Sequence, residues 1–153
     1  MNEPVTPMMK QYFEIKSQYE DCILFYRLGD FYEMFYDDAI KASKILEISL
    51  TGRNCGQEER APMCGVPYHS AENYIAKLIK NGLKVAVCEQ VEDPKSAKGI
   101  VKRDIIRVIT PGTANLDAVL TSGENNFLAC VYMNGDSYAV SLCDVSTGEL
   151  VVN

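Results

Sequence analysis

The feature that most constrains this chain is a pair of β-type segments separated by two residues with strong turn chemistry. Residues 22–28 are apolar and aromatic, and Gly29-Asp30 favours a tight turn. Residues 31–36, with the sequence FYEMFY, resume a composition typical of strands. The sequence therefore predicts an antiparallel hairpin with its tip at Gly29-Asp30.

The second strand of this hairpin carries an acidic residue between two phenylalanines. Because alternate side chains of a strand share a face, Phe31, Glu33 and Phe35 should point to the same side. In a structural interpretation, Phe31 is a core aromatic and Glu33 protects an edge strand. In a functional interpretation, the ring and the carboxylate are exposed together and probe a DNA groove. The pattern alone leaves both interpretations open.

Helical spacing and capping residues predict three helices. Thr6 and Ser70 are candidate N-caps, Asp37-Asp38 supply negative charge at a helix start, and Asn81-Gly82 can end a helix. The predicted helices cover residues 7–19, 37–46 and the segment between Ser70 and Asn81. Further strands are expected at residues 48–53, 61–68, 84–91 and 104–110. This order predicts an α/β (α+β) fold, with about three helices packed on a mixed sheet, over residues 1–113.

A change in charge follows this predicted domain. All 15 Lys and Arg residues lie at or before Arg107, and the change comes after the turn-forming residues 110–113. Residues 114–126 are predicted to be a linker. A second hairpin follows over residues 127–144, with Asn134-Gly135 as a type I′ turn, and a third strand is expected from Glu149 to Val152. Since a lone hairpin is marginal in water, residues 127–153 are interpreted as the truncated start of a second domain, and the chain as the front piece of a longer protein.

The composition excludes several classes of protein. A hydrophobic content of 47% with 24% charged residues is typical of a globular protein, and no apolar run reaches the roughly 18 residues that span a bilayer. Without a signal peptide, a cytoplasmic location without membrane contact and six reduced cysteines are expected. Cys55, Cys64 and His69 match no zinc spacing, so no metal site is predicted. A net charge of −6 requires any DNA contact to be local.

Several segments together resemble the start of the MutS family of bacterial DNA mismatch-repair proteins. The hairpin sequence FYRLGDFYE is the most specific of them, and the others occur in the same order along the chain. These segments are TPMMKQY (6–12), FYRLGDFYE (25–33), ISLT (48–51), GVPYH (65–69), VCEQ (87–90) and TPGT (110–113). The resemblance implies that residues 1–113 are a mismatch-recognition domain, and that residues 127–153 open a connector domain of ribonuclease-H-like fold.

The resemblance assigns mismatch binding to Phe31 and Glu33, which fall on the family's Phe-x-Glu motif. The Phe is expected to stack on a mispaired base from the minor groove, while the Glu hydrogen-bonds to that base. Such a wedge selects base steps that unstack at low cost, and a carboxylate in an electronegative groove is penalised unless it finds a free base N–H. Possible supporting DNA contacts are Leu28, Asp30, Lys41, Arg53, Arg60, Val66 and Pro67.

The resemblance also bears on cofactors and partners. The sequence has no G-x-x-x-x-G-K-[ST] loop, so ATP and Mg²⁺ are expected only in the full-length parent, and this piece is expected to be no enzyme and to hold no cofactor. The expected partner is mismatched double-stranded DNA. The parent is expected to be a homodimer coupled to the MutL repair partner, and the fragment to be a monomer.

The sequence leaves two other functions open. One is a metal-dependent nuclease that uses the acidic residues Asp30, Glu33, Asp37 and Asp38. The other is a protein-interaction module with exposed aromatic anchors.

Overall fold

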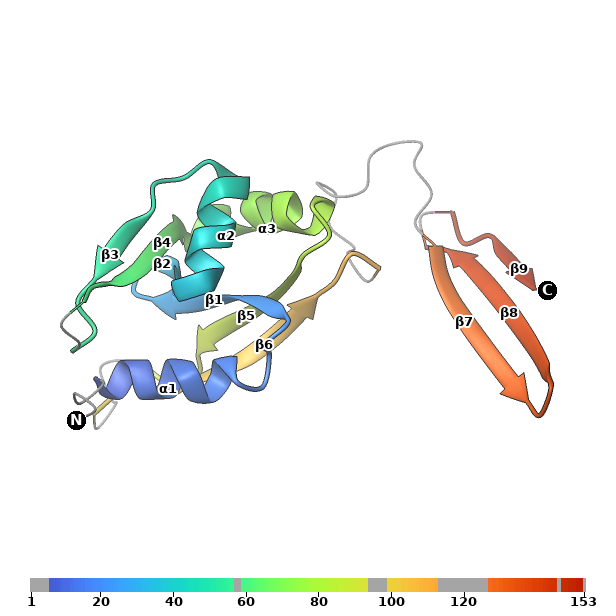
Figure 1. Cartoon of the computed structure of the whole chain (residues 1–153), viewed down its shortest axis with the longest axis horizontal. Coiled ribbons are helices and arrows are strands. Elements are labelled where there is room, and N and C mark those ends of the chain that lie inside the picture. The colour runs from blue at the N-terminus through green and yellow to red at the C-terminus, as the bar shows by residue number, and fades with distance from the viewer. Residues whose placement is uncertain (1–5, 57–58, 94–98, 113–126, 146, 153) are drawn as a thin grey trace.

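The computed structural model describes residues 6–56, 59–93, 99–112, 127–145 and 147–152, and within these ranges the chain forms two separate β-sheets (Figure 1). The larger sheet is mixed, because its first and fifth strands pair in parallel while every other neighbouring pair is antiparallel. Its strands are β1 (Cys22–Leu28), β2 (Phe31–Phe35), β3 (Thr51–Arg53), β4 (Ala61–Pro67), β5 (Lys84–Gln90) and β6 (Arg103–Ile109). Their order across the sheet is β3-β4-β2-β1-β5-β6.

Helices cover both faces of the larger sheet. Helix α1 (Pro7–Lys16) lies on one face, whereas α2 (Tyr36–Leu46) and α3 (Ala71–Lys80) lie on the other (Figure 1). A short 3₁₀ helix, η1 (Tyr68–Ser70), joins β4 to α3. The prediction of three helices packed on a mixed sheet is confirmed.

Strand β1 contributes to the hydrophobic core on both sides of the sheet. Ile23 and Phe25 pack in the cluster under α2 and α3, while Leu24 and Tyr26 pack in the cluster under α1. A strand buried on both faces needs apolar side chains at consecutive positions. The layered arrangement therefore explains why residues 22–26 read as an unbroken apolar run rather than as an alternating pattern.

Local signals located most elements within a few residues. The β1–β2 hairpin has the predicted bounds except that α2 begins at Tyr36, and the Thr6 hydroxyl accepts a bond from the Met9 amide at 3.4 Å, as expected of an N-cap. Helix α1 ends at Lys16 rather than at residue 19. The following amides bond three residues back, Gln18 to Ile15 and Tyr19 to Lys16, and this tighter turn directs the chain into β1.

Two local predictions were wrong. Strand β3 begins at Thr51 rather than at residue 48, because Glu47 adopts a left-handed conformation (φ 58°) and the Ile48 amide bonds back to the Ser43 carbonyl. The Ser70 side chain does not cap α3, since its hydroxyl donates to the Pro67 carbonyl within η1. In both places, a group that the prediction assigned to the next element is already hydrogen-bonded to a preceding carbonyl: the Ile48 amide in the first case and the Ser70 hydroxyl in the second.

The smaller sheet consists of β7 (Phe127–Asn134), β8 (Ser137–Asp144) and β9 (Leu150–Val152), in that order. The predicted hairpin is present, but Asn134 pairs with Ser137, so the turn residues are Gly135-Asp136 rather than Asn134-Gly135. Of these two, only Gly135 has a positive φ, which fits a type II′ turn instead of type I′. The predicted linker, 114–126, lies outside the described residues.

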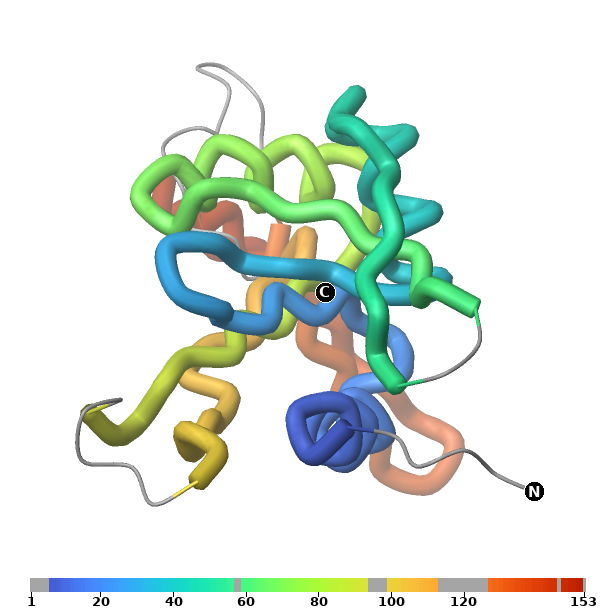
Figure 2. The backbone as a smooth tube through the Cα atoms, turned by 90° about the vertical axis from the view of Figure 1, so that its left-hand side faces the viewer, coloured from blue at the N-terminus to red at the C-terminus, as the bar shows by residue number. Residues whose placement is uncertain are grey.

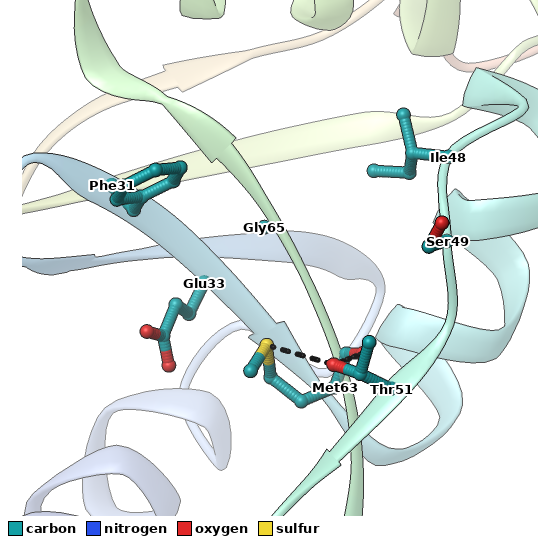
Figure 3. A pocket seen from close by; sticks show the side chains of 7 residues that line it. All are labelled: Phe31, Glu33, Ile48, Ser49, Thr51, Met63 and Gly65. Atoms are coloured by element: carbon teal, nitrogen blue, oxygen red, sulfur yellow. Dashed lines mark hydrogen bonds between the residues drawn. The ribbon is translucent and has the colours of Figure 1, made fainter.

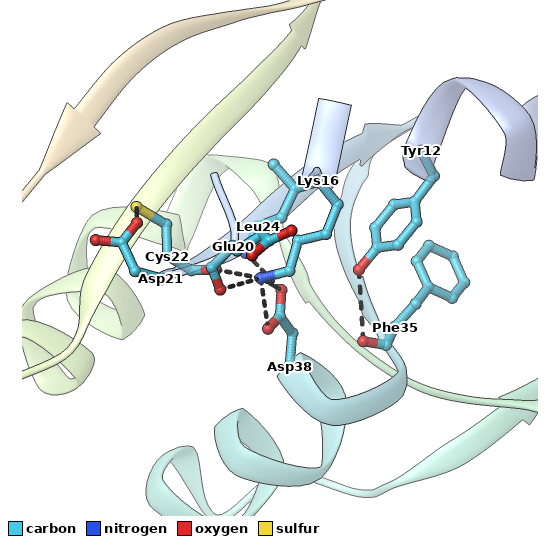
Figure 4. A network of polar contacts seen from close by, with 8 residues as sticks. All are labelled: Tyr12, Lys16, Glu20, Asp21, Cys22, Leu24, Phe35 and Asp38. Atoms are coloured by element: carbon cyan, nitrogen blue, oxygen red, sulfur yellow. Dashed lines mark hydrogen bonds and ion pairs between the residues drawn. The ribbon is translucent and has the colours of Figure 1, made fainter. Parts of the chain in front are cut away.

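A buried carboxylate joins α1, β1 and α2 on the larger sheet (Figure 4). Asp38 is only 5% exposed, accepts a hydrogen bond from the Leu24 amide at 2.9 Å, and forms an ion pair with Lys16 at 3.0 Å. The Lys16 ammonium also donates to the carbonyls of Cys22 and Glu20. Burial raises the pKa of Asp38, and the bonds from Leu24 and Lys16 oppose this shift. Asp38 is therefore more than a favourable charge at a helix start.

Asp38→Ala should lower the free energy of unfolding by about 3 kcal/mol, because the Leu24 amide loses its acceptor and Lys16 loses its counter-charge. The control is Asp37→Ala, an exposed carboxylate in the same helical turn, which should cost only about 0.3–1 kcal/mol. Urea denaturation followed by far-UV circular dichroism measures both. Equal losses would contradict a structural role for the buried network.

Candidate functional site

Phe31 opens strand β2 directly after the hairpin turn, and its ring is 48% exposed. Phe35 lies on the same face of the same strand but is fully buried, since the Tyr12 ring of α1 packs against it with ring centroids 5.1 Å apart. Helix α1 thus covers one end of β2 and leaves the other end open. The interpretation of Phe31 as a core aromatic is wrong.

Glu33 lies between these two residues along the strand, and its carboxylate forms an ion pair with Arg53. Its Oε2 is 2.5 Å from Nη1 of Arg53 on β3, and the two side chains are 15% and 38% exposed, respectively. Strand β2 pairs with β1 on one side and β4 on the other, so Glu33 is not on an edge strand. The interpretation of Glu33 as the protector of a sheet edge is therefore wrong.

A pocket of about 470 Å³ opens beside the two residues (Figure 3). Its lining is Phe31, Glu33, Ile48, Ser49, Thr51, Met63 and Gly65. Gly65 pairs with Glu33 across the β2–β4 ladder, and a Cβ placed there would lie 3.3 Å from the Tyr32 carbonyl oxygen and 3.5 Å from Cγ of Glu33. The missing side chain at Gly65 leaves this space open. The pocket offers an aromatic ring, apolar walls and one carboxylate.

The other predicted supporting residues are only partly brought to this site. Pro67 pairs with Phe31 on β4, and Asp30 is exposed in the turn, where its carbonyl accepts a bond from the Tyr68 amide at 3.0 Å. Leu28 is opposite Phe31 in the hairpin and partly buried against the cluster under α1. Arg60 is exposed, and its guanidinium donates to the Gly52 carbonyl.

Two of the supporting residues lie elsewhere. Val66 is buried in the core under α2 and α3, so its side chain does not form an apolar rim. Lys41 is exposed on α2, which covers the face of the sheet opposite to Phe31. Sequence reasoning placed both near the wedge because it had no information about which face each element covers.

A polar cluster behind the turn escaped sequence reasoning. Arg27 and Tyr32 both bond to Glu89 of β5, with Nη1 of Arg27 3.1 Å from Oε1 of Glu89. The Arg27 guanidinium also lies over the Tyr68 ring. Burial, followed by the hydrogen bond to Glu89, raises the pKa of Tyr32 to about 12. Arg27 and Glu89 are 62 positions apart in the sequence, so no local pattern predicts their contact.

The described residues do not assemble the alternative metal sites. They contain no group of three or more His, Cys, Asp or Glu side chains that could hold a metal ion. Cys55 and Cys64 lie in the cores on opposite faces of the sheet, and burial raises the pKa of both thiols. Among the nuclease candidates, Glu33 is paired with Arg53 and Asp38 with Lys16.

None of the helices in the described residues has both the length and the apolar composition of a membrane span.

Comparisons with known proteins agree on one family. Residues 6–118 match the family model described as MutS domain I. The chain is 62% identical over 147 residues to the DNA mismatch repair protein MutS of Acetivibrio thermocellus, with 96% of this chain and 17% of that protein covered. It is 64% identical over 148 residues to the protein of that name from Caldicellulosiruptor bescii, with coverage of 97% and 17%.

A third relative, the DNA mismatch repair protein MutS of Clostridioides difficile, is 61% identical over 145 residues, with coverage of 95% and 15%. The chain thus spans only about a sixth of the length of these curated relatives. A match over most of the chain, at this identity, leaves one assignment: the chain belongs to the MutS family, and its larger sheet lies within the match to domain I.

Proposed function

We propose that this chain reads mispaired or unpaired bases in double-stranded DNA, as the mismatch-recognition part of a MutS protein. The observation that carries the proposal is the exposed ring of Phe31, beside Glu33 and an open pocket, on a strand whose other aromatic and apolar side chains pack into the cores (Figure 3). The name of the relatives, DNA mismatch repair protein MutS, supports the same function.

In this proposal Phe31 acts as a wedge. A side chain inserted from the minor groove has to unstack a base step, which costs a few kcal/mol, and a smooth bend of the site costs about 1–6 kcal/mol more. Both costs fall where pairing is already defective. Phe31 therefore selects sites by the ease of deformation, without reading a particular sequence.

Glu33 supplies the second part of the test. A carboxylate that enters the electronegative minor groove is disfavoured unless it accepts a hydrogen bond from a free base N–H, or takes up a proton and donates to a purine nitrogen. Paired bases already use their imino protons. Glu33 thus disfavours intact duplex more than mismatched duplex.

Arg53 has to be included in this mechanism, because it pairs with Glu33 in the DNA-free chain. Its guanidinium is more exposed than the carboxylate and is chemically suited to a phosphate oxygen. In the proposed complex, Arg53 transfers from Glu33 to the DNA backbone and leaves the carboxylate to meet the base. The net charge of −6 makes such local cation contacts important for binding.

We assign this activity to residues 1–113 and propose residues 127–153 as part of a second domain. The sequence printed for this chain contains no phosphate-binding loop, so in a full-length MutS protein ATP and Mg²⁺ would act outside these residues. Dimer formation and coupling to the MutL partner would likewise belong to the full-length assembly.

Phe31→Ala should reduce affinity for a G·T mismatch by about ten- to a hundredfold, since stacking of a base on an aromatic ring contributes about 1–3 kcal/mol. The matched control is Phe13→Ala, an aromatic ring of similar exposure (41%) on α1. Fluorescence anisotropy with mismatched and matched duplexes, in a full-length MutS protein that carries this sequence, measures the effect. Equal affinities for the two variants would remove Phe31 as the wedge.

Glu33→Ala should tighten binding to perfectly matched duplex by roughly three- to tenfold and reduce discrimination, because the repulsive carboxylate is lost and Arg53 is freed for phosphate. Glu72→Ala is the control, since Glu72 is an exposed acid that also pairs with an arginine, Arg107. The same anisotropy titrations, repeated at two salt concentrations, provide the measurement. Weaker binding to matched duplex would contradict this role for Glu33.

A further inference from the structure

The turn that carries Phe31 is supported from behind by a cluster that we name the turn clamp: Arg27, Tyr68 and Glu89. We propose that Arg27 is the positioning residue of this clamp. It holds the β1–β2 turn in place, and therefore also Phe31, while the ring is inserted into DNA. This inference rests on the proposed function, and it concerns residues that do not themselves form the wedge.

The guanidinium of Arg27 is held on three sides. Its Nε donates to the Gly29 carbonyl in the turn at 2.5 Å, and Nη1 donates to Oε1 of Glu89 at 3.1 Å. Its Cζ lies 3.8 Å from the centroid of the Tyr68 ring. One planar group thus connects the tip of the hairpin to β5 and to η1, and the side chain is only 16% exposed.

The partners of Arg27 are themselves anchored. The Tyr32 hydroxyl donates to the same Glu89 oxygen, and the Tyr68 amide donates to the Asp30 carbonyl at 3.0 Å. Figure 2 shows the β1–β2 turn (blue) beside the segment in which β4 passes into α3 (green). The clamp is therefore connected to the larger sheet at several points.

Strand register places the clamp on the side of the hairpin away from the wedge. Arg27 is opposite Tyr32, and Leu28 is opposite Phe31. Since adjacent residues of a strand face opposite sides, Arg27 and Tyr32 share the face under α2 and α3, whereas Phe31 points to the other face. Arg27 can thus fix the turn without occupying the space that DNA would take.

The two residues at the tip of the turn, Gly29 and Asp30, are both exposed and gain little support from packing. Gly29 has a φ of +57°, and a Cβ built there would meet no atom within 4 Å. A hairpin tip with few packing contacts moves easily. Because unstacking a base step costs free energy, a mobile tip would be displaced instead of being inserted. A lysine at position 27 would keep the charge but lose both the planar fork and most of the stacking on Tyr68.

The first experiment measures the position of the wedge without DNA. The chain has no tryptophan, so Phe31→Trp places one reporter at the wedge. In the 153-residue chain, adding Arg27→Lys should increase the subnanosecond part of the tryptophan anisotropy decay, because the turn becomes mobile. Arg107→Lys, at an arginine of β6 that pairs with Glu72 of α3, should leave the decay unchanged.

An unchanged decay in the Arg27→Lys background would overturn the inference. If that variant loses its native fold, as monitored by circular dichroism, Arg27 can be kept and its partners changed: Glu89→Gln removes the charge that pairs with Arg27, and Tyr68→Leu removes the ring over which it lies. Glu89→Gln also keeps an acceptor for the Tyr32 hydroxyl. No increase in mobility in either variant would again overturn the role of the clamp.

The second experiment separates this inference from the proposed function. In a full-length MutS protein that carries this sequence with Phe31 intact, Arg27→Lys should weaken G·T binding by roughly five- to thirtyfold with little change for matched duplex. Full mismatch affinity in that variant would overturn the positioning role. If the unmodified protein did not prefer the mismatch, the proposed function would fail, whatever the anisotropy decay shows.

Discussion

The ion pair between Lys16 and the buried Asp38 joins the end of helix α1 to β1 and α2, and the position of α1 decides which part of β2 is covered. From there, the ring of Tyr12 reaches Phe35 and covers the second half of β2. Phe31, four residues earlier and on the same face, remains uncovered. The position of α1 thus determines which of the two phenylalanines on this face is buried and which is exposed.

The pairing of Glu33 with Arg53 changes how the Phe-x-Glu segment should be understood. In the DNA-free chain the Glu33 carboxylate is held beside the Arg53 guanidinium, so it is not an unpaired charge at the surface. In the proposed complex, repulsion between Glu33 and an intact duplex takes effect once Arg53 moves from the carboxylate to a phosphate oxygen. The two side chains come from β2 and β3, and strand β4 lies between those strands in the sheet.

What could be predicted from sequence follows the range of the interactions. The hairpin turn at Gly29-Asp30, the N-cap at Thr6 and the left-handed Gly82 just after α3 are set by neighbouring residues, and they lie where expected. The late start of β3 follows from the left-handed Glu47 at the end of α2, a conformation that a residue other than glycine rarely adopts. The burial of Val66 depends instead on α2 and α3, which local patterns do not include. The same holds for the site. The exposure of Phe31 could be predicted only with the position of α1 known, and the partners of Glu33 and Arg27, which are Arg53 and Glu89, come from other strands.

The parallel pairing of β1 with β5 has a consequence for how the chain reaches this structure during synthesis. The ladder joins Cys22 to Lys84, and every residue of α2, β3, β4 and α3 lies between them. A ribosome that has released the first hairpin has therefore not yet made the strand on its other side. Until that strand emerges, the apolar flank of the nascent hairpin is open to chaperones and to aggregation.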